Sequence, residues 1–165
     1  RNFMSEIIDY IPYLRKKIGH DKCLSVGLTA MVFNQKGEVL IERRKDNGKY
    51  CFPGGSIDLN ETVLEGLKRE IKEETGIEIK NISLFSIRSG EKCDFYYPNG
   101  DITQYVDLNF LAEADGRIEI KAQASETTEV YFCPFDRLPS RAQFTPGSSS
   151  MIEKYLKKDF RITID

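Results

Sequence analysis

Apolar residues recur every three or four positions between residues 61 and 75, which predicts an amphipathic helix. Gly76 follows this segment, and glycine commonly ends helices. Asp58 or Asn60 is expected to cap the N-terminus of the helix, because both side chains accept hydrogen bonds from free backbone N–H groups. A final helix is predicted over residues 148–158, after a loop that contains two prolines.

A further helix is expected over residues 5–18, where isoleucines and leucines recur at helical spacing. Pro12 lies inside this segment and is expected to kink or break the helix, because proline lacks a backbone N–H donor. The segment precedes the expected core of residues 23–139. We interpret it as an extension that covers a site, forms a dimer face or only packs. A homodimer is favoured by analogy alone.

Alternating and β-branched residues dominate most of the remaining chain and predict strands. These strands are expected over residues 24–33, 39–43, 50–52, 77–88, 94–97, 102–112, 117–120 and 129–135. Many strands around one central and one terminal helix are typical of an α+β fold rather than of alternating βαβ units. The length of 165 residues is enough for one core, so residues 1–165 are predicted to form a single domain.

Two consecutive glycines, Gly54 and Gly55, stand between the predicted strand 50–52 and the central helix. Because glycine has no Cβ, such a pair is typical of a turn with unusual backbone angles. The missing side chains also allow the backbone to approach another group closely. A functional loop is therefore expected immediately before the central helix.

Composition argues against several classes of function. The formal charge is −2, with 24 Lys and Arg against 26 Asp and Glu, so the sequence does not supply the positive field that binds nucleic-acid polymers. The sequence shows no stretch typical of a membrane span or a signal peptide. The four cysteines lie far apart, without the paired spacing of zinc or redox sites. We expect buried thiols in a cytoplasmic enzyme with neither a membrane nor a nucleic-acid polymer as partner.

Three glutamates of the central helix, Glu70, Glu73 and Glu74, carry the candidate chemistry. At about 100° per residue they fall on one edge of the helix, whereas Lys72 points elsewhere. Like charges at this spacing destabilise a helix unless a cation lies between them. Carboxylate oxygens favour Mg²⁺ or Mn²⁺, and Mg²⁺ commonly binds substrate phosphates as well. The pattern predicts a divalent-cation site and a phosphate-bearing substrate.

Two neighbouring features modify this site. Glu74 lies close in angle to the apolar side of the helix, so we expect it to be partly shielded from water, which strengthens its interaction with a cation. Arg69 immediately precedes the cluster. It is expected to pair with Glu61 or Glu73 and to orient the helix against the glycine pair.

Residues 55–77 match the pattern G-x5-E-x7-R-E-U-x-E-E-x-G-U, where U is aliphatic, at every position, and in this motif the chain resembles the Nudix hydrolase family. A weaker similarity extends over residues 23–139. The resemblance implies an α/β/α sandwich with a mixed sheet, in which the motif forms a loop and a helix. It also implies that the three glutamates, helped by the Gly54 carbonyl, bind Mg²⁺ or Mn²⁺. The implied reaction is hydrolysis of a nucleoside diphosphate linked to another moiety.

Three positions in or near the motif depart from the residues common in the family. Tyr50 stands where many members have tryptophan, and Asn60 stands where glycine is common. Because asparagine tolerates a positive φ, the second change is expected to be mild. Gly66 replaces a frequent alanine, at a cost of about 1 kcal/mol in helix propensity, and close packing is the expected reason.

Hydrolysis requires an aligned and deprotonated water, and the sole histidine, His20, lies outside the motif. A glutamate is therefore expected to act as the general base. Family members use either a glutamate of the motif or one from a later loop. The candidates are Glu70 and Glu74 within the motif, and Glu126 or Glu129 beyond it.

Basic and aromatic residues near the glycine pair are candidates for binding the substrate. Arg43 is the first choice for a phosphate contact, followed by Arg44 and Lys45, and a surface ion pair is the alternative role for Arg43. Planar partners for a base, each of which could instead be core packing, are Phe33, Tyr50, Tyr97 and Tyr105.

Two other functions are possible on the same fold. One is a nucleotide-binding or regulatory module without catalysis, and the complete motif argues against it. The other is an isomerase of isoprenoid diphosphates, which the shortage of histidine argues against. Among hydrolases, the sequence leaves nucleoside triphosphates, ADP-ribose-type compounds and nucleotide sugars open as substrates.

Overall fold

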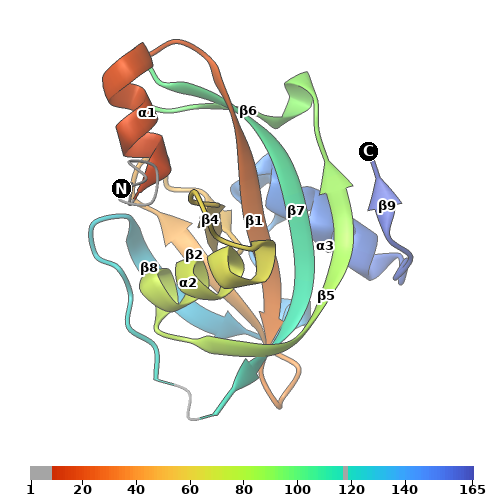
Figure 1. Ribbon diagram of the computed structural model, residues 1–165. Coiled ribbons are helices and arrows are strands. Elements are labelled where there is room, and N and C mark those ends of the chain that lie inside the picture. The colour runs from red at the N-terminus through yellow and green to blue at the C-terminus, as the bar shows by residue number, and fades with distance from the viewer. Residues whose placement is uncertain (1–8, 117–118) are drawn as a thin grey trace.

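The computed structural model describes residues 9–116 and 119–165 (Figure 1). Its three α-helices and nine strands, counted over these residues, include short strands that add to the edges of the main sheet. In chain order the elements are α1 (Tyr10–Ile18), β1 (Cys23–Phe33), β2 (Val39–Arg44), β3 (Tyr50–Cys51), β4 (Gly54–Ser56), α2 (Val63–Thr75), β5 (Glu78–Arg88), β6 (Asp94–Tyr96), β7 (Ile102–Asp115), β8 (Thr127–Cys133), α3 (Pro146–Leu156) and β9 (Thr163–Ile164).

The strands form a mixed sheet, as the sequence predicted, in the order β3-β2-β1-β7-β5-β9. β1 and β7 run parallel along their whole shared length, from Cys23 opposite Thr103 to Phe33 opposite Glu113. β5 pairs antiparallel with β7, and β8 pairs antiparallel with β2. β4 pairs with β1, which places the start of the motif beside the centre of the sheet.

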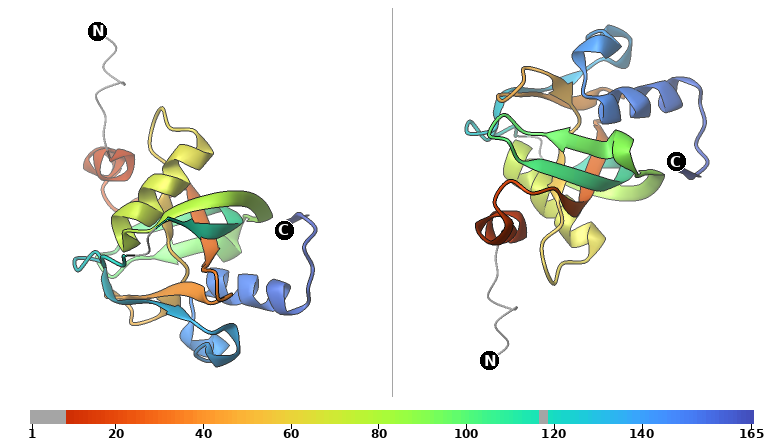
Figure 2. Two further views of the ribbon diagram at one scale, coloured as in Figure 1. Left: turned by 90° about the horizontal axis from the view of Figure 1, so that it is seen from below. Right: turned by 90° about the horizontal axis from the view of Figure 1, so that it is seen from above.

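Helices α2 and α3 lie on opposite sides of the central strands (Figure 2). Alternation along β1 divides its side chains between the two sides: Leu28 packs in the core beneath α2, whereas Met31 packs in the core beneath α3. Leu67 and Ile71 of α2 are fully buried in the first core, which stabilises the fold by roughly 1.5–3 kcal/mol for each side chain. The α/β/α arrangement fixes the otherwise acidic α2 against the sheet.

The N-terminus of α2 differs from the prediction. Thr62 is the N-cap, and its side chain and that of Glu65 form a reciprocal capping box, so neither Asp58 nor Asn60 caps this helix. Asp58 instead accepts a hydrogen bond of 2.8 Å from the backbone N–H of Tyr10, at the start of α1. Asn60 adopts a φ of 68°, which confirms the expected left-handed conformation.

The glycine pair forms part of a strand rather than a turn. Neither Gly54 nor Gly55 has a positive φ, so the prediction of unusual backbone angles was wrong. The prediction of close approach is confirmed, because a Cβ on Gly54 would lie 1.9 Å from the carbonyl oxygen of Leu28. Gly66 also packs closely, since a Cβ there would lie 2.9 Å from Leu28 Cδ1.

The ends of other elements also differ from their predicted positions. Of the strand predicted over residues 117–120, residues 117–118 lie outside the described residues and residues 119–120 have no regular structure. Residues 5–8 of the predicted first helix also lie outside the described part. Pro12 does not break α1, because it is the third helical residue and its missing N–H falls in the first turn. α3 starts at Pro146, two residues earlier than predicted.

Three of the four cysteines are buried as predicted, and Cys23 is partly exposed. All four are free, and Cys51, Cys93 and Cys133 are buried. Over residues 9–116 and 119–165, no helix combines the length and the apolar character needed to cross a membrane.

Candidate functional site

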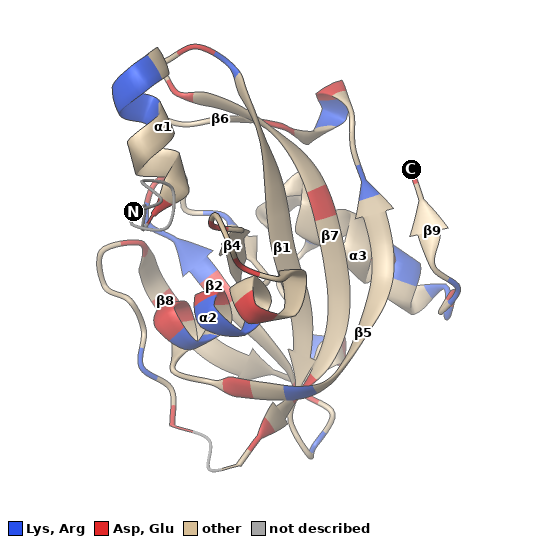
Figure 3. Cartoon of the chain, in the orientation of Figure 1, with Lys and Arg blue, Asp and Glu red and all other residues tan. Residues whose placement is uncertain are grey.

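Two adjoining cavities meet beside the glycine pair. Glu42, Arg44, Gly54 and Gly55 line both of them, together with two tyrosines, Tyr97 and Tyr105. The outer cavity is bounded by the acidic edge of α2, the start of α1 and the loop before β8. The inner cavity lies between the sheet and the N-terminal end of α3. Figure 3 shows acidic residues on α2 and basic residues at the end of β2. Of these, Glu70, Glu73, Glu74 and Arg44 line the outer cavity.

Glu74 lies at the bottom of the outer cavity. Its residue exposure is only 6%, which confirms the shielding expected from its position on the helix. One carboxylate oxygen accepts a hydrogen bond of 3.3 Å from the N–H of Gly54. Burial and the nearby charge of Glu42 raise the pKa of Glu74 well above its ordinary value. The side chain is therefore costly to ionise without a cation.

Glu42 is a site residue that the sequence analysis missed. It lies on β2, is 4% exposed and lies beside Glu74, so two buried carboxyl groups are neighbours. Its Oε1 accepts a weak hydrogen bond from the Cys51 thiol, whereas Oε2 is buried without a partner among the described residues. Burial raises the pKa of Glu42. The sequence pattern that could have identified Glu42 is an acidic residue directly after three apolar residues, Val39–Ile41. In the structure all three are buried.

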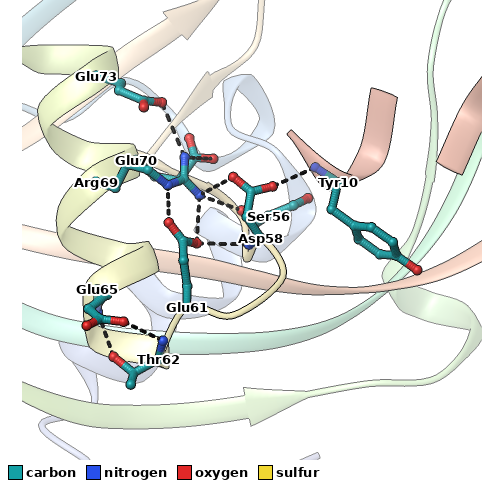
Figure 4. Close-up of polar contacts among 9 residues, drawn as sticks. All are labelled: Tyr10, Ser56, Asp58, Glu61, Thr62, Glu65, Arg69, Glu70 and Glu73. Atoms are coloured by element: carbon teal, nitrogen blue, oxygen red, sulfur yellow. Dashed lines mark hydrogen bonds and ion pairs between the residues drawn. The ribbon is translucent and has the colours of Figure 1, made fainter. Parts of the chain in front are cut away.

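Arg69 lies at the centre of a carboxylate cluster (Figure 4). Both partners predicted from the sequence are present: Glu61 forms a two-nitrogen ion pair, and Glu73 lies 3.3 Å from Nη1. Nη2 also lies 3.1 Å from Asp58, the residue that holds the start of α1. Arg69 therefore ties α2, the motif loop and, through Asp58, α1 together.

Glu70 lies between Arg69 and the glycine pair. Its Oε1 accepts a hydrogen bond of 3.0 Å from Arg69 Nη1, and a Cβ on Gly55 would lie 2.3 Å from its carboxyl carbon. Burial raises the pKa of Glu70 to about 7, against the opposing effect of Arg69. The glycine at position 55 thus makes the room that this carboxyl group occupies.

These acidic residues fit a divalent cation. In the described part of the chain, no three such side chains are arranged around one point, and Glu70 and Glu73 are turned toward Arg69. However, the neighbouring carboxyl groups of Glu42 and Glu74 and the unpartnered Glu42 Oε2 leave oxygen donors in the cavity wall without a positive partner. Hard oxygen donors of this kind suit Mg²⁺ or Mn²⁺. Glu70, Glu73 and Glu74 are the side chains that would hold the ion.

The metal-free protein is expected to lose stability as pH rises. An acid whose folded pKa is raised stabilises the fold below its ordinary pKa, and that contribution is lost as pH passes through the folded pKa. For Glu70 the window runs from 4.5 to about 7, and Glu42 and Glu74 act in the same direction. Each group lowers the free energy of unfolding by up to about 1.4 kcal/mol per pH unit in its window.

Urea unfolding in EDTA between pH 5 and pH 8 measures this loss. Mg²⁺ should restore stability at pH 8, because a ligand that binds only the folded state stabilises it. The variant Glu42→Gln should flatten the pH slope, since an amide cannot ionise. A wild-type slope of zero would contradict the shifts assigned to these carboxyl groups.

Glu126 lies at the site, whereas Glu129 does not. Glu126 lines the outer cavity on the loop before β8, and its carbonyl accepts a hydrogen bond of 2.9 Å from the N–H of Lys45. Its charge raises the pKa of both Glu42 and Glu70. Glu129 does not line either cavity and accepts a hydrogen bond from the hydroxyl of Tyr50.

The two arginines of β2 have different environments. Arg44 lines both cavities, pairs with Asp46 at 2.6 Å and lies 4.8 Å from the centre of the Phe95 ring. Arg43, the first choice from the sequence, does not line either cavity. It donates to the carbonyl of Gly48 and lies over the ring of Tyr50. Strand alternation explains the difference, because Arg44 shares a face with Glu42 and Arg43 does not.

Lys45, the third basic candidate, lines the outer cavity, whereas Tyr50, His20 and Lys72 do not line either cavity. Tyr50 packs against Phe144 and contacts Glu129 and Arg43, outside both cavities. His20 is exposed and lies 2.7 Å from Asp101. Lys72 pairs with Glu78, away from the acidic edge of α2, as the sequence predicted.

Comparison with known proteins agrees with this geometry. The family model described as the NUDIX domain matches residues 24–155. A MutT-like protein from Streptomyces ambofaciens is 43% identical over 117 residues, which cover 71% of this chain and 68% of that protein. An ADP-ribose pyrophosphatase from Methanocaldococcus jannaschii is 33% identical over 67% of this chain and 63% of its own length.

Among solved structures, a MutT NUDIX hydrolase from Burkholderia pseudomallei superimposes with a TM-score of 0.64 at 26% identity, over 79% of this chain and 97% of that one. The likeness supports the α/β/α fold with a mixed sheet. The family model extends through the motif glutamates and beyond them to α3. The chain therefore belongs to the Nudix hydrolase family.

Proposed function

We propose that this Nudix hydrolase cleaves the diphosphate linkage of a small nucleotide-like substrate with Mg²⁺ or Mn²⁺ as cofactor. The observation that carries the proposal is the junction of the two cavities, where Glu42 and the cationic Arg44 line both cavities and the buried Glu74 lines the outer one. A bound divalent cation would supply neutralisation of the phosphate oxygens and a more acidic water. Arg44 is positioned to donate hydrogen bonds to a phosphate at the junction.

The acidic residues divide naturally between two roles. Glu70, Glu73 and Glu74 lie on α2, at the edge held by Arg69, and are assigned to the cation. Glu126 is exposed in the outer cavity and belongs to a separate loop, which leaves it free to accept a proton from water. We assign the general base to Glu126 and the orientation of the acidic edge to Arg69.

Glu126→Gln is expected to lower kcat by about 100-fold or more with little change in KM, because loss of a general base removes transition-state stabilisation. Glu129→Gln is the matched control, since Glu129 is also exposed but does not line either cavity. Steady-state kinetics at saturating Mg²⁺ measures both. An unchanged rate for Glu126→Gln would return the role of base to Glu70 or Glu74.

The activity itself is tested by phosphate release from a panel of substrates. The panel contains ADP-ribose, nucleotide sugars, dinucleoside polyphosphates, and normal and oxidised nucleoside triphosphates, each with Mg²⁺, Mn²⁺ or EDTA. ADP-ribose is included because one relative is named an ADP-ribose pyrophosphatase, and the triphosphates because another, from Haemophilus influenzae, is named an 8-oxo-dGTP diphosphatase. We expect cleavage of one class that EDTA abolishes. Binding of a nucleotide without cleavage of any substrate would instead support a non-catalytic module.

A further inference from the structure

The inner cavity has a polar floor, although it lies against the middle of the sheet. Three side chains make up this floor: Arg88 of β5, and Asp107 and Asn109 of β7. Arg88 is directly opposite Asp107 in the register of the two strands, so the side chains share one face. Asn109 lies two residues further along the same face and donates to the hydroxyl of Ser86 at 3.1 Å.

Arg88 and Asp107 are close but not paired. Arg88 Nε is buried without a hydrogen-bond partner over the described part of the chain, and the two residues form no ion pair there. Asp107 lies near the Cys93 thiol, and burial raises the pKa of Asp107. A buried donor without an acceptor costs about 1–3 kcal/mol, which a ligand that accepts from Arg88 would offset.

Gly27 leaves room for the Asp107 carboxyl group. A Cβ at position 27 would lie 2.5 Å from Asp107 Oδ1 and 3.2 Å from the ring of Tyr105. Gly27 is opposite Asp107 in the register of β1 and β7, so no side chain from β1 covers the floor at this point. Gly27 therefore leaves the polar floor uncovered on the β1 side.

The walls of the inner cavity favour a flat group. Phe95, Tyr97 and Tyr105 line this cavity, as do the N-cap and first turn of α3, residues 145–148. A phosphate on the floor would be repelled by Asp107, and a cation would be repelled by Arg88. A neutral planar ring with a hydrogen-bond acceptor beside a donor satisfies both groups. Nucleobases have such edges.

We propose that the inner cavity binds the nucleobase of the substrate, with Arg88 donating to a ring acceptor and Asp107 accepting from a neighbouring N–H. The proposal deepens and rests on the proposed function, because it places the diphosphate at the junction beside Arg44. The moiety beyond the diphosphate then lies in the outer cavity beneath α1, where Ile11 and Pro12 line the wall.

Calorimetric titration in the absence of metal tests the proposal with four probes: UMP, GMP, AMP and ribose 5-phosphate. At least one nucleotide is expected to bind about tenfold or more tightly than ribose 5-phosphate, which has the sugar and phosphate without the base. Equal affinity for ribose 5-phosphate and for every nucleotide would overturn the proposal. This comparison uses the wild-type protein and does not depend on any variant.

Variants then test the residues. Asp107→Asn and Arg88→Gln should each weaken the preferred nucleotide about tenfold and leave ribose 5-phosphate unchanged. Lys80→Gln is the control, because Lys80 lies on the same strand, pairs with Asp115 and does not line either cavity. Circular dichroism checks that each variant is folded. Nucleotide affinities equal to that of the wild type in both floor variants would overturn the assignment.

The base-binding proposal and the proposed function can fail independently of one another. Preference for a nucleotide over ribose 5-phosphate, with no hydrolysis of any substrate, would support the base-binding cavity and contradict the hydrolase. Metal-dependent hydrolysis without preference for a base would support the hydrolase and contradict the cavity assignment.

Discussion

Glu74→Gln is expected to lower kcat by more than about 100-fold while the protein remains folded, because the change removes one charge from the cation site without changing volume. Glu74 is 6% exposed, and its carboxyl group lies beside that of Glu42. The metal-free variant should also be more stable than the wild type at pH 8, since the amide carries no buried charge. Steady-state kinetics and urea unfolding measure the two effects.

Glu78→Gln provides the control for the same chemical change near the same helix. Glu78 is exposed and pairs with Lys72, away from the acidic edge of α2. Its replacement should change kcat by less than about twofold, because exposed ion pairs contribute little. Near-wild-type turnover of Glu74→Gln at saturating Mg²⁺ would contradict the assignment of Glu74 to the cation.

The sequence predicted the central helix and its acidic edge because both depend on local order. Helical spacing alone places Glu70, Glu73 and Glu74 together, and the apolar residues on the other side determine which of them is buried. The motif then added the family and therefore the α/β/α arrangement. Contacts within about eight residues, such as that of Arg69 with Glu61, were predictable in the same way.

Residues that reach the site from other elements were not predictable in this way. Glu42 comes from β2 and lies beside Glu74 only because β2 and α2 line the same outer cavity. Strand alternation places Arg43 and Arg44 on opposite faces of β2. Which of these faces points to the site is set by the pairing of β2 with β3 and β8, so the sequence alone did not favour Arg44 over Arg43. Asp58 contacts Tyr10, which is 48 residues distant. Tertiary pairing determines each of these positions.

The polar floor of the inner cavity shows the same limit. Arg88 and Asp107 are nineteen residues apart and become neighbours through the β5–β7 register, which contains two irregularities. A one-residue shift of a strand would move its side chains to the other face, so no sequence pattern short of the full pairing predicts this floor. The base-binding part of the site therefore depends on sheet topology, whereas the cation-binding part depends on one helix.

Gly54→Ala is expected to reduce the free energy of unfolding by about 3 kcal/mol or more, the largest stability effect we predict. The new Cβ would lie 1.9 Å from the Leu28 carbonyl oxygen and 2.8 Å from the Cα of Thr29, so a backbone must move in the central strand. Leu28 belongs to the core beneath α2, and movement of β1 disturbs that packing. Urea unfolding of both proteins gives the difference.

Gly55→Ala is the matched variant, because its Cβ meets the Glu70 carboxyl group at 2.3 Å rather than a backbone. A carboxyl group at the end of a flexible side chain can move away, so Gly55→Ala should lose less stability than Gly54→Ala. The displaced Glu70 should nevertheless lower the affinity for Mn²⁺ and the rate. A lower stability of Gly55→Ala than of Gly54→Ala would contradict the role of Gly54 in making room for the backbone of β1. Full Mn²⁺ affinity of Gly55→Ala would contradict the role of Gly55 in making room for the Glu70 carboxyl group.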